Sequence, residues 1–214
     1  MKPLVLLLFV LSIFSCNQDP TPATTASANP AKSNINEDFQ KLFEEVNVVK
    51  MHLFGTNEAE PTVDDYPYVG KVIEESSLKY LGDGLQPNEI GSIYACYRTE
   101  VSNFYILRVP GKYASSDLVL ASWDDASSKL VKVLDLANTQ CDEGLCHQQD
   151  AWLTDLDDDR SLELVIRSYS NDNGKISDES FSVLSQGSPG KFTKAPEALA
   201  SLAPPTSYVM YQKK

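Results

Sequence analysis

The sequence has few of the residues on which nucleic-acid-binding proteins and many enzymes depend. It contains only two histidines, and its 18 lysines and arginines are outnumbered by 30 aspartates and glutamates, so the formal net charge is −12. The basic residues are scattered and form no patch that could neutralise phosphates. Nucleic acid and anionic membrane surfaces are therefore poor partners, whereas a cation, a basic peptide or a neutral ligand suits this charge.

Common catalytic motifs are also missing from the sequence. No glycine-rich phosphate loop precedes a predicted helix, and the run from Gly187 to Gly190 has the wrong spacing for a nucleophile elbow. Two histidines offer little general acid–base chemistry, although carboxylates could take that role. These absences favour a protein that is not an enzyme.

The apolar run at residues 4–14 is too short to cross a membrane. It has about eleven residues, whereas a spanning helix needs ~20. Lys2 precedes the run and Ser15 ends it, and a positive start, a short apolar region and a small residue before a cleavage site are typical of an export signal. The sequence therefore predicts a signal peptide over residues 1–15.

The four residues Ile13-Phe14-Ser15-Cys16 resemble the lipobox of bacterial lipoproteins. In that family the fourth residue is a lipidated cysteine, the third is small and the first is a branched aliphatic. The resemblance implies cleavage before Cys16, acyl chains such as palmitate on that cysteine, and a cell-envelope protein whose membrane partner is reached through this lipid. Asn17 in place of Asp favours the outer membrane, by analogy with enteric lipoproteins. An ordinary cleaved signal and an uncleaved anchor are the alternatives.

Two regions follow the predicted signal. Residues 16–36 hold the cysteine and a linker rich in Pro, Thr, Ala and Ser, which has too few large apolar side chains to order itself. Residues 37–214 have the length and the apolar content of one globular domain.

Within that domain the pattern of apolar residues is mainly that of β-strands. Residues 38–51 carry an apolar stripe at helical spacing, and Asn36 is a suitable N-cap, so an N-terminal amphipathic helix is expected there. Short runs rich in Val, Ile, Leu and Tyr then alternate with turn residues, among them Asn173-Gly174. The expected strands are 68–73, 90–99, 104–109, 118–123, 129–136, 151–154, 162–169 and 180–185, with 208–211 as a further short one. The predicted fold is a β-rich antiparallel meander, resembling one to two propeller-blade-like sheets.

The cysteines other than Cys16 suggest one local disulfide. Cys141 and Cys146 enclose a short loop that contains Gly144, and export would place them in an oxidising compartment, so we expect them to pair. Cys96 lies in an apolar run and is expected to be a buried thiol. Haem or zinc bound by Cys141, Cys146 and His147 is a weaker interpretation, because the spacing is wrong for haem and a fourth zinc ligand is missing.

The acidic segment at residues 155–163 is the clearest chemical motif. Carboxylates recur at its first, third, fifth and ninth positions, and such spacing can point several hard oxygens inward, as calcium requires. The predicted calcium ligands are the side chains of Asp155, Asp157, Asp159 and Glu163 and the backbone carbonyl of Ser161. The alternatives are an acidic hairpin turn that binds no metal and a catalytic metal site.

This loop and the apolar run after it resemble the calcium loop of FG-GAP and VCBS β-propeller repeats. The resemblance covers about thirty residues, and no second Asp-rich loop follows at a regular period, so a full propeller is not expected. An EF-hand is not expected either, because Ile166 stands where its twelfth-position Glu would be. Arg160 departs from the pattern, since the sixth position is usually Gly.

We therefore expect a lipid-anchored binding or interaction domain of the cell envelope, with structural calcium and an unknown envelope protein or ligand as its partner. An envelope hydrolase that uses the acidic-loop carboxylates is the alternative, and a purely structural lipoprotein is a third interpretation.

Overall fold

The computed structural model describes residues 36–46, 50–64, 66–89, 91–99, 104–112, 115–159, 161–188 and 190–201. The predicted signal peptide, the lipid site at Cys16, the linker up to residue 35 and the strand expected at 208–211 lie outside these residues. The chain divides into residues 1–31 and 32–214, and everything below concerns the second unit. Within the described ranges, no helix combines the length and the apolar character that a membrane crossing requires.

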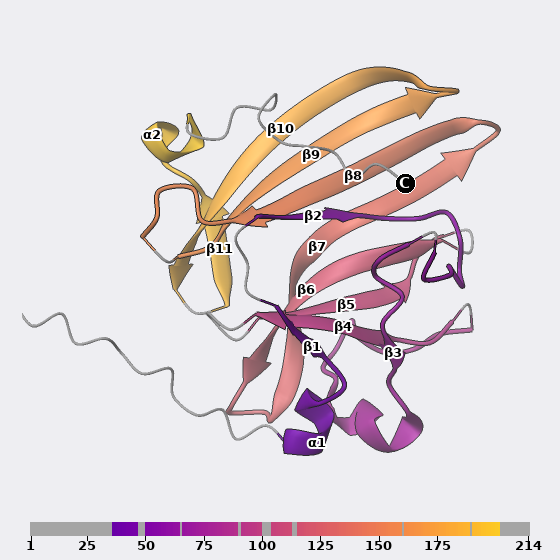
Figure 1. The fold of residues 1–214 in the computed structure, drawn as a ribbon, viewed down its shortest axis with the longest axis vertical. Coiled ribbons are helices and arrows are strands. Elements are labelled where there is room, and N and C mark those ends of the chain that lie inside the picture. Colours follow the sequence, from indigo (N-terminus) through magenta and orange to yellow (C-terminus); the bar gives the residue numbers. More distant parts are fainter. Residues whose placement is uncertain are drawn as a thin grey trace, which may run out of the picture. The chain divides into compact units, whose positions relative to one another are not determined.

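The described part of the chain is mainly β, as predicted. Strands β4 to β11 pair in chain order, each antiparallel to the next, so the expected meander is confirmed (Figure 1). The short strand β1 runs parallel to β4, which makes the sheet mixed. The strands are β1 (Glu44–Val46), β2 (Lys50–Phe54), β3 (Lys71–Val72), β4 (Tyr94–Thr99), β5 (Phe104–Pro110), β6 (Ser116–Asp124), β7 (Lys129–Asp142), β8 (Leu145–Thr154), β9 (Glu163–Asp172), β10 (Lys175–Ser188) and β11 (Lys191–Lys194), and the helices are α1 (Glu37–Gln40), the 3₁₀ helix η1 (Glu75–Tyr80) and α2 (Glu197–Ala200).

The N-terminal helix is much shorter than the apolar stripe predicts. Asn36 caps α1 as expected, because its Oδ1 accepts hydrogen bonds from the backbone N–H groups of Asp38 and Phe39. The helix ends at Gln40 instead of continuing to Met51, which is a correction to the prediction. The later part of the stripe is rich in β-branched valine, and it forms β1 and β2, which pair with β4 and β8.

The core lies on both faces of the central strands. In β5, Phe104 and Ile106 join one hydrophobic cluster, while Tyr105 and Leu107 join another on the opposite face. Side chains alternate across a strand, so a strand buried on both sides is apolar at nearly every position. The first cluster also contains side chains of β8 and β9, so the two halves of the sheet pack face to face, and α1 and η1 cover the second cluster.

Strand β8 changes its neighbour halfway along its length. Its first half, up to Gln149, pairs with the end of β7, and its second half, from Asp150, pairs with β2. At the branch point the Gln149 side-chain amide donates to the backbone carbonyls of Asp135 and Leu136, at 2.9 and 3.1 Å. These bonds connect the two halves of the sheet where the strands separate.

Beyond the branch, β7, β8, β9 and β10 continue as long curved strands that lie side by side (Figure 1). Tight turns close the two hairpins at their ends, at Glu143-Gly144 and at Asn173-Gly174, and both residues of each turn have positive φ. Asn-Gly is favoured in such turns because both residues tolerate this conformation, so the turn predicted at Asn173 is confirmed.

Candidate functional site

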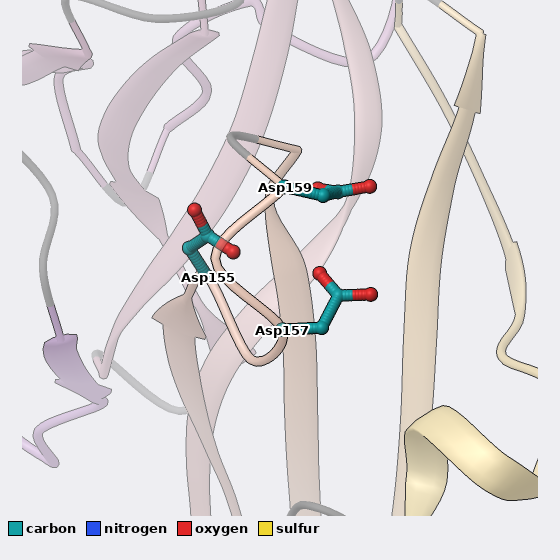
Figure 2. A group of neighbouring side chains, drawn as sticks. All are labelled: Asp155, Asp157 and Asp159. Atoms are coloured by element: carbon teal, nitrogen blue, oxygen red, sulfur yellow. The ribbon is translucent and has the colours of Figure 1, made fainter.

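The acidic loop connects two adjacent strands of the sheet. It leaves β8 after Thr154 and enters β9 at Glu163. Each of Asp155, Asp157 and Asp159 offers a carboxylate oxygen, and these three oxygens lie within 4.8 Å of one another. Figure 2 shows the side chains of Asp157 and Asp159 pointing to the same side of the loop. Three carboxylate oxygens this close could supply part of the oxygen shell that calcium prefers.

The loop reaches this shape through local backbone contacts. The backbone N–H of Ser161 donates to Oδ1 of Asp159 at 2.6 Å, and Asp158 has a φ of 60°. Aspartate is among the few residues that tolerate this left-handed region, which allows the sharp turn without glycine. Arg160, the residue that departs from the family pattern, lies outside the described residues.

Glu163, the first residue of β9, contacts the backbone of the loop. Its side chain is 2% exposed, and its Oε2 accepts a hydrogen bond from the backbone N–H of Leu156 at 2.8 Å. Burial raises the pKa of Glu163, the Leu156 N–H opposes this shift, and the negative charges of the loop aspartates add to it. The structure thus brings Asp155, Asp157 and Asp159 together. Calcium binding by these three residues, by Ser161 and by Glu163 stays a prediction.

The structure confirms the predicted pairing of Cys141 with Cys146 and the predicted burial of Cys96. Cys141 and Cys146 face each other on β7 and β8, and their sulfur atoms lie at disulfide distance, 2.09 Å. A bonded pair leaves no thiolate for haem or zinc. Cys96 is a buried free thiol as expected, and burial raises its pKa to about 12.

Two adjoining hollows lie on the long strands, at a place that no sequence motif predicted. One of about 600 Å³ lies at the β7–β8 tip, and one of about 440 Å³ lies next to it on the sheet. Gln140 and His147, which pair across β7 and β8, line both hollows. Nδ1 of His147 lies 3.1 Å from Oγ of the buried Ser170 on β9. The sequence signal for these hollows is a run of consecutive polar residues on each strand, Asn138–Gln140 and His147–Asp150.

The two hollows differ in charge. Acidic side chains, Asp142, Glu143 and Asp172, surround the hollow at the tip. The second hollow is lined mainly by amide, hydroxyl and imidazole side chains, which are Asn138, Gln140, His147, Gln148, Gln149, Ser168, Tyr169 and Ser170, together with Asp178. This surface can therefore offer amide and hydroxyl groups in rows, with a negative rim at one end.

Comparisons with known proteins identify no family for this chain. No family model, no curated protein and no solved structure matches the chain.

Proposed function

We propose that the protein is a lipid-anchored binding domain of the bacterial cell envelope, held at the outer membrane through acyl chains on Cys16. The observation that carries the binding role is the pair of adjoining hollows that share Gln140 and His147. Together they form a polar surface on strands that extend beyond the core, where a ligand or an envelope protein can dock.

We also propose a structural calcium ion in the acidic loop. The support is the approach of three carboxylates to within 4.8 Å, because without a cation their like charges repel one another. When bound, the ion would supply charge neutralisation and cross-link the loop. Asp155, Asp157 and Asp159 would hold it, and Glu163 would keep the loop in shape through Leu156.

An envelope hydrolase is the second candidate. The observation in its favour is the raised pKa of Glu163, which a general acid needs. However, the Glu163 side chain is buried and bonded to the loop backbone, so a substrate would reach it only if the loop moved. An Asp157→Ala variant that stays folded but loses hydrolysis of purified peptidoglycan would decide for this candidate.

In-cell photo-crosslinking tests the binding role. A photoreactive amino acid replaces Gln140 in the hollows, and a second variant carries it at the exposed Thr193 on β11 as the control. We expect cross-linked products from position 140 and not from position 193. A further variant carries the photoreactive residue at position 168, in the second hollow. The absence of cross-linked products from both position 140 and position 168 would contradict the proposal.

Mass analysis of the mature N-terminus tests the anchor. We expect an acylated Cys16 in the membrane fraction, and a Cys16→Ser variant that leaves that fraction. An unmodified Cys16 in the processed protein would refute the lipoprotein assignment without affecting the binding role.

A further inference from the structure

The core-facing side of the long strands changes from apolar to polar at the branch point. Ala151 of β8 and Ile166 of β9 pair with each other and pack in the first core cluster. Side chains alternate between the two faces of a strand, so every second residue outward from this pair continues the same face. The next pair on that face is Gln149 with Ser168. The surface that continues the core is therefore polar where the strands extend beyond it.

Hydrogen-bonding side chains form two rows across the four long strands of Figure 1. The strand pairings place Asn138, Gln149, Ser168 and Ser180 in one row and Gln140, His147, Ser170 and Ser177 in the next. Neighbours are about 4.8 Å apart across the strands and roughly 6.8 Å apart along them. We call these eight residues the polar grid. Its members on β7, β8 and β9 line the second hollow, and Gln140 and His147 continue it into the first.

Every residue type in the polar grid can both donate and accept hydrogen bonds. Asparagine and glutamine offer an amide NH2 and a carbonyl, serine offers a hydroxyl, and neutral histidine offers one nitrogen of each kind. The hydroxyl groups of a sugar also donate and accept, so they match these side chains. Among the described residues that line the hollows there is no lysine or arginine, so a phosphate or carboxylate ligand would lack a counter-charge.

Carboxylates lie at the outer end of the polar grid. The next row toward the tip consists of Asp142, Leu145, Asp172 and Lys175. Asp142 and Asp172 line the first hollow together with Glu143, whereas Lys175 lines neither hollow. Asp178, at the β-bulge of β10, adds a carboxylate to the second hollow. This end of the surface attracts a cationic group and repels an anionic one.

Lipids and extended peptides fit this surface less well. Leu145 is the one aliphatic side chain among the described residues that line the hollows, so an acyl chain would find little apolar area there. Extended peptides commonly bind by adding a strand to a free sheet edge. In the region of the grid, β8 and β9 are each paired on both sides, so their backbone groups are already used.

We infer that the polar grid binds an oligosaccharide that carries amino groups, with its hydroxyls on the two rows and a protonated amine among the carboxylates at the tip. This inference rests on the proposed binding function, since it names the ligand class of the same site. The hollows, of about 440 and 600 Å³, each have the size of a small-molecule site, so together they accommodate several sugar units. Hydrogen bonds position the saccharide, and the carboxylates select amino sugars over neutral and acidic ones.

Calorimetric titration with three hexasaccharides tests the inference. All three have the same β-1,4-linked backbone but differ at carbon 2, where cellohexaose has a hydroxyl, chitohexaose an acetamide, and deacetylated chitohexaose an amine. The full chain is purified in a detergent without a sugar headgroup, in a weakly acidic buffer that keeps the amines protonated. We expect the amine form to bind several-fold more tightly than the other two, with an advantage that shrinks as salt is added. Equal binding of all three, or binding of none, would overturn the inference.

Substitutions on the rows test the hydrogen-bonding part of the site. Gln140→Leu and His147→Phe remove donors and acceptors at similar size, and each should weaken binding of the amine form roughly three- to tenfold. Thr193→Val, on β11 and outside the hollows, is the control that should bind like the natural protein. Unchanged affinity in both row variants would overturn the inference, because charge attraction alone would then explain the binding.

Substitutions at the tip test the selection of the amine. Asp142→Asn with Asp172→Asn should remove the advantage of deacetylated chitohexaose and leave the weaker binding of cellohexaose in place. Asp125→Asn, an equal change of charge in the β6–β7 turn, should keep the advantage. An advantage that survives in the double tip variant would overturn the placement of the amine at the tip.

The photo-crosslinks from position 140 separate failure of this inference from failure of the binding function. A saccharide identified by mass spectrometry in the cross-linked product supports both. A protein in that product, with no saccharide binding by calorimetry, would overturn the inference and leave the binding function standing. The absence of any product, from position 168 as well, would overturn both.

Discussion

The guanidinium carbon of Arg108 lies 3.6 Å from the centre of the Tyr94 ring. Arg108 is buried on β5, and its Nε and Nη1 donate to the backbone carbonyls of Val69 and Ala59 at 3.1 and 2.8 Å. Nη1 also donates to Oγ of Ser116 at 3.0 Å. One side chain therefore attaches the irregular segment between β2 and β3 to the central strands.

Replacement of Arg108 by methionine should destabilise the fold. The change removes three charge-assisted hydrogen bonds and the cation–π contact, and it takes the side-chain donor from the half-buried Val69 carbonyl, so we expect a loss of about 3 kcal/mol in the free energy of unfolding. Arg108→Lys should recover only part of the loss, because an ammonium lacks the planar fork. Urea denaturation measures both, with Arg98→Lys as a control near the surface. A loss below about 0.5 kcal/mol for Arg108→Met would contradict this role.

Calcium should raise the thermal midpoint if it occupies the acidic loop. Saturation at ~100 times the dissociation constant stabilises a protein by about 2.7 kcal/mol, which for this size corresponds to a rise of roughly 5–10 °C. Asp157→Asn should remove most of the rise, while Asp125→Asn, an exposed carboxylate in the β6–β7 turn, should keep it. An identical midpoint with calcium and with chelator would exclude the calcium proposal.

Asp117 on β6 should make stability fall as the pH rises. Burial, with a further contribution from the charge of Asp135, raises the pKa of Asp117 to about 6. In the unfolded state its pKa is close to 3.8, so between about pH 4 and 6 the native state holds a proton that the unfolded state has lost. The free energy of unfolding therefore falls as the pH rises through this range. Asp117→Asn should therefore gain stability relative to the natural protein across that window, by about 1–2 kcal/mol after allowance for solvent screening.

Urea unfolding at several pH values checks this prediction. Asp124→Asn is the control. Hydrogen bonds from Ser127 and Ala126 lower the pKa of the exposed Asp124 carboxylate, so this variant should not show the gain in stability expected for Asp117→Asn. A difference between Asp117→Asn and the natural protein that stays constant with pH would show that Asp117 does not titrate in this range.

Loss of the Cys141–Cys146 disulfide should cost little stability. The bond closes a loop of only six residues, for which the chain-entropy model predicts about 2 kcal/mol. The Glu143-Gly144 turn already holds the strands together, so we expect about 1–2 kcal/mol for the double variant Cys141→Ser, Cys146→Ser. Dithiothreitol should destabilise the natural protein by the same amount and leave the double variant unchanged. Complete unfolding on reduction would disprove this estimate.

The predictions that held depend on short-range information. Short runs rich in Val, Ile, Leu and Tyr indicated strands β5, β6 and β9, and Asn173-Gly174 indicated a hairpin, because turn geometry is decided within four residues. The helix expected up to Met51 failed for the opposite reason. Pairing with β4 and β8, which lie far away in sequence, outweighed the helical spacing of its apolar residues.

For the candidate sites, too, features within one short segment could be predicted from the sequence, and features that join distant segments could not. The close approach of Asp155, Asp157 and Asp159 follows from their alternation in one short loop. The buried position of Glu163 does not, since it depends on the pairing of β9 with β8 and on the contact between Glu163 and the Leu156 backbone. Gln140 and His147 were overlooked as site residues because their shared hollows arise only when β7 and β8 pair.

The sequence by itself determined the β-rich class, the meander, the local cysteine pair and the acidic loop. Each of these follows from contacts between residues near one another in the chain, or from strand periodicity. Only the tertiary structure decided that β8 leaves β7 for β2, that Arg108 is buried against Tyr94, and that Asp150 is buried beside His52. These features join segments far apart in the chain, and their energies come from burial and hydrogen bonding that no local pattern records.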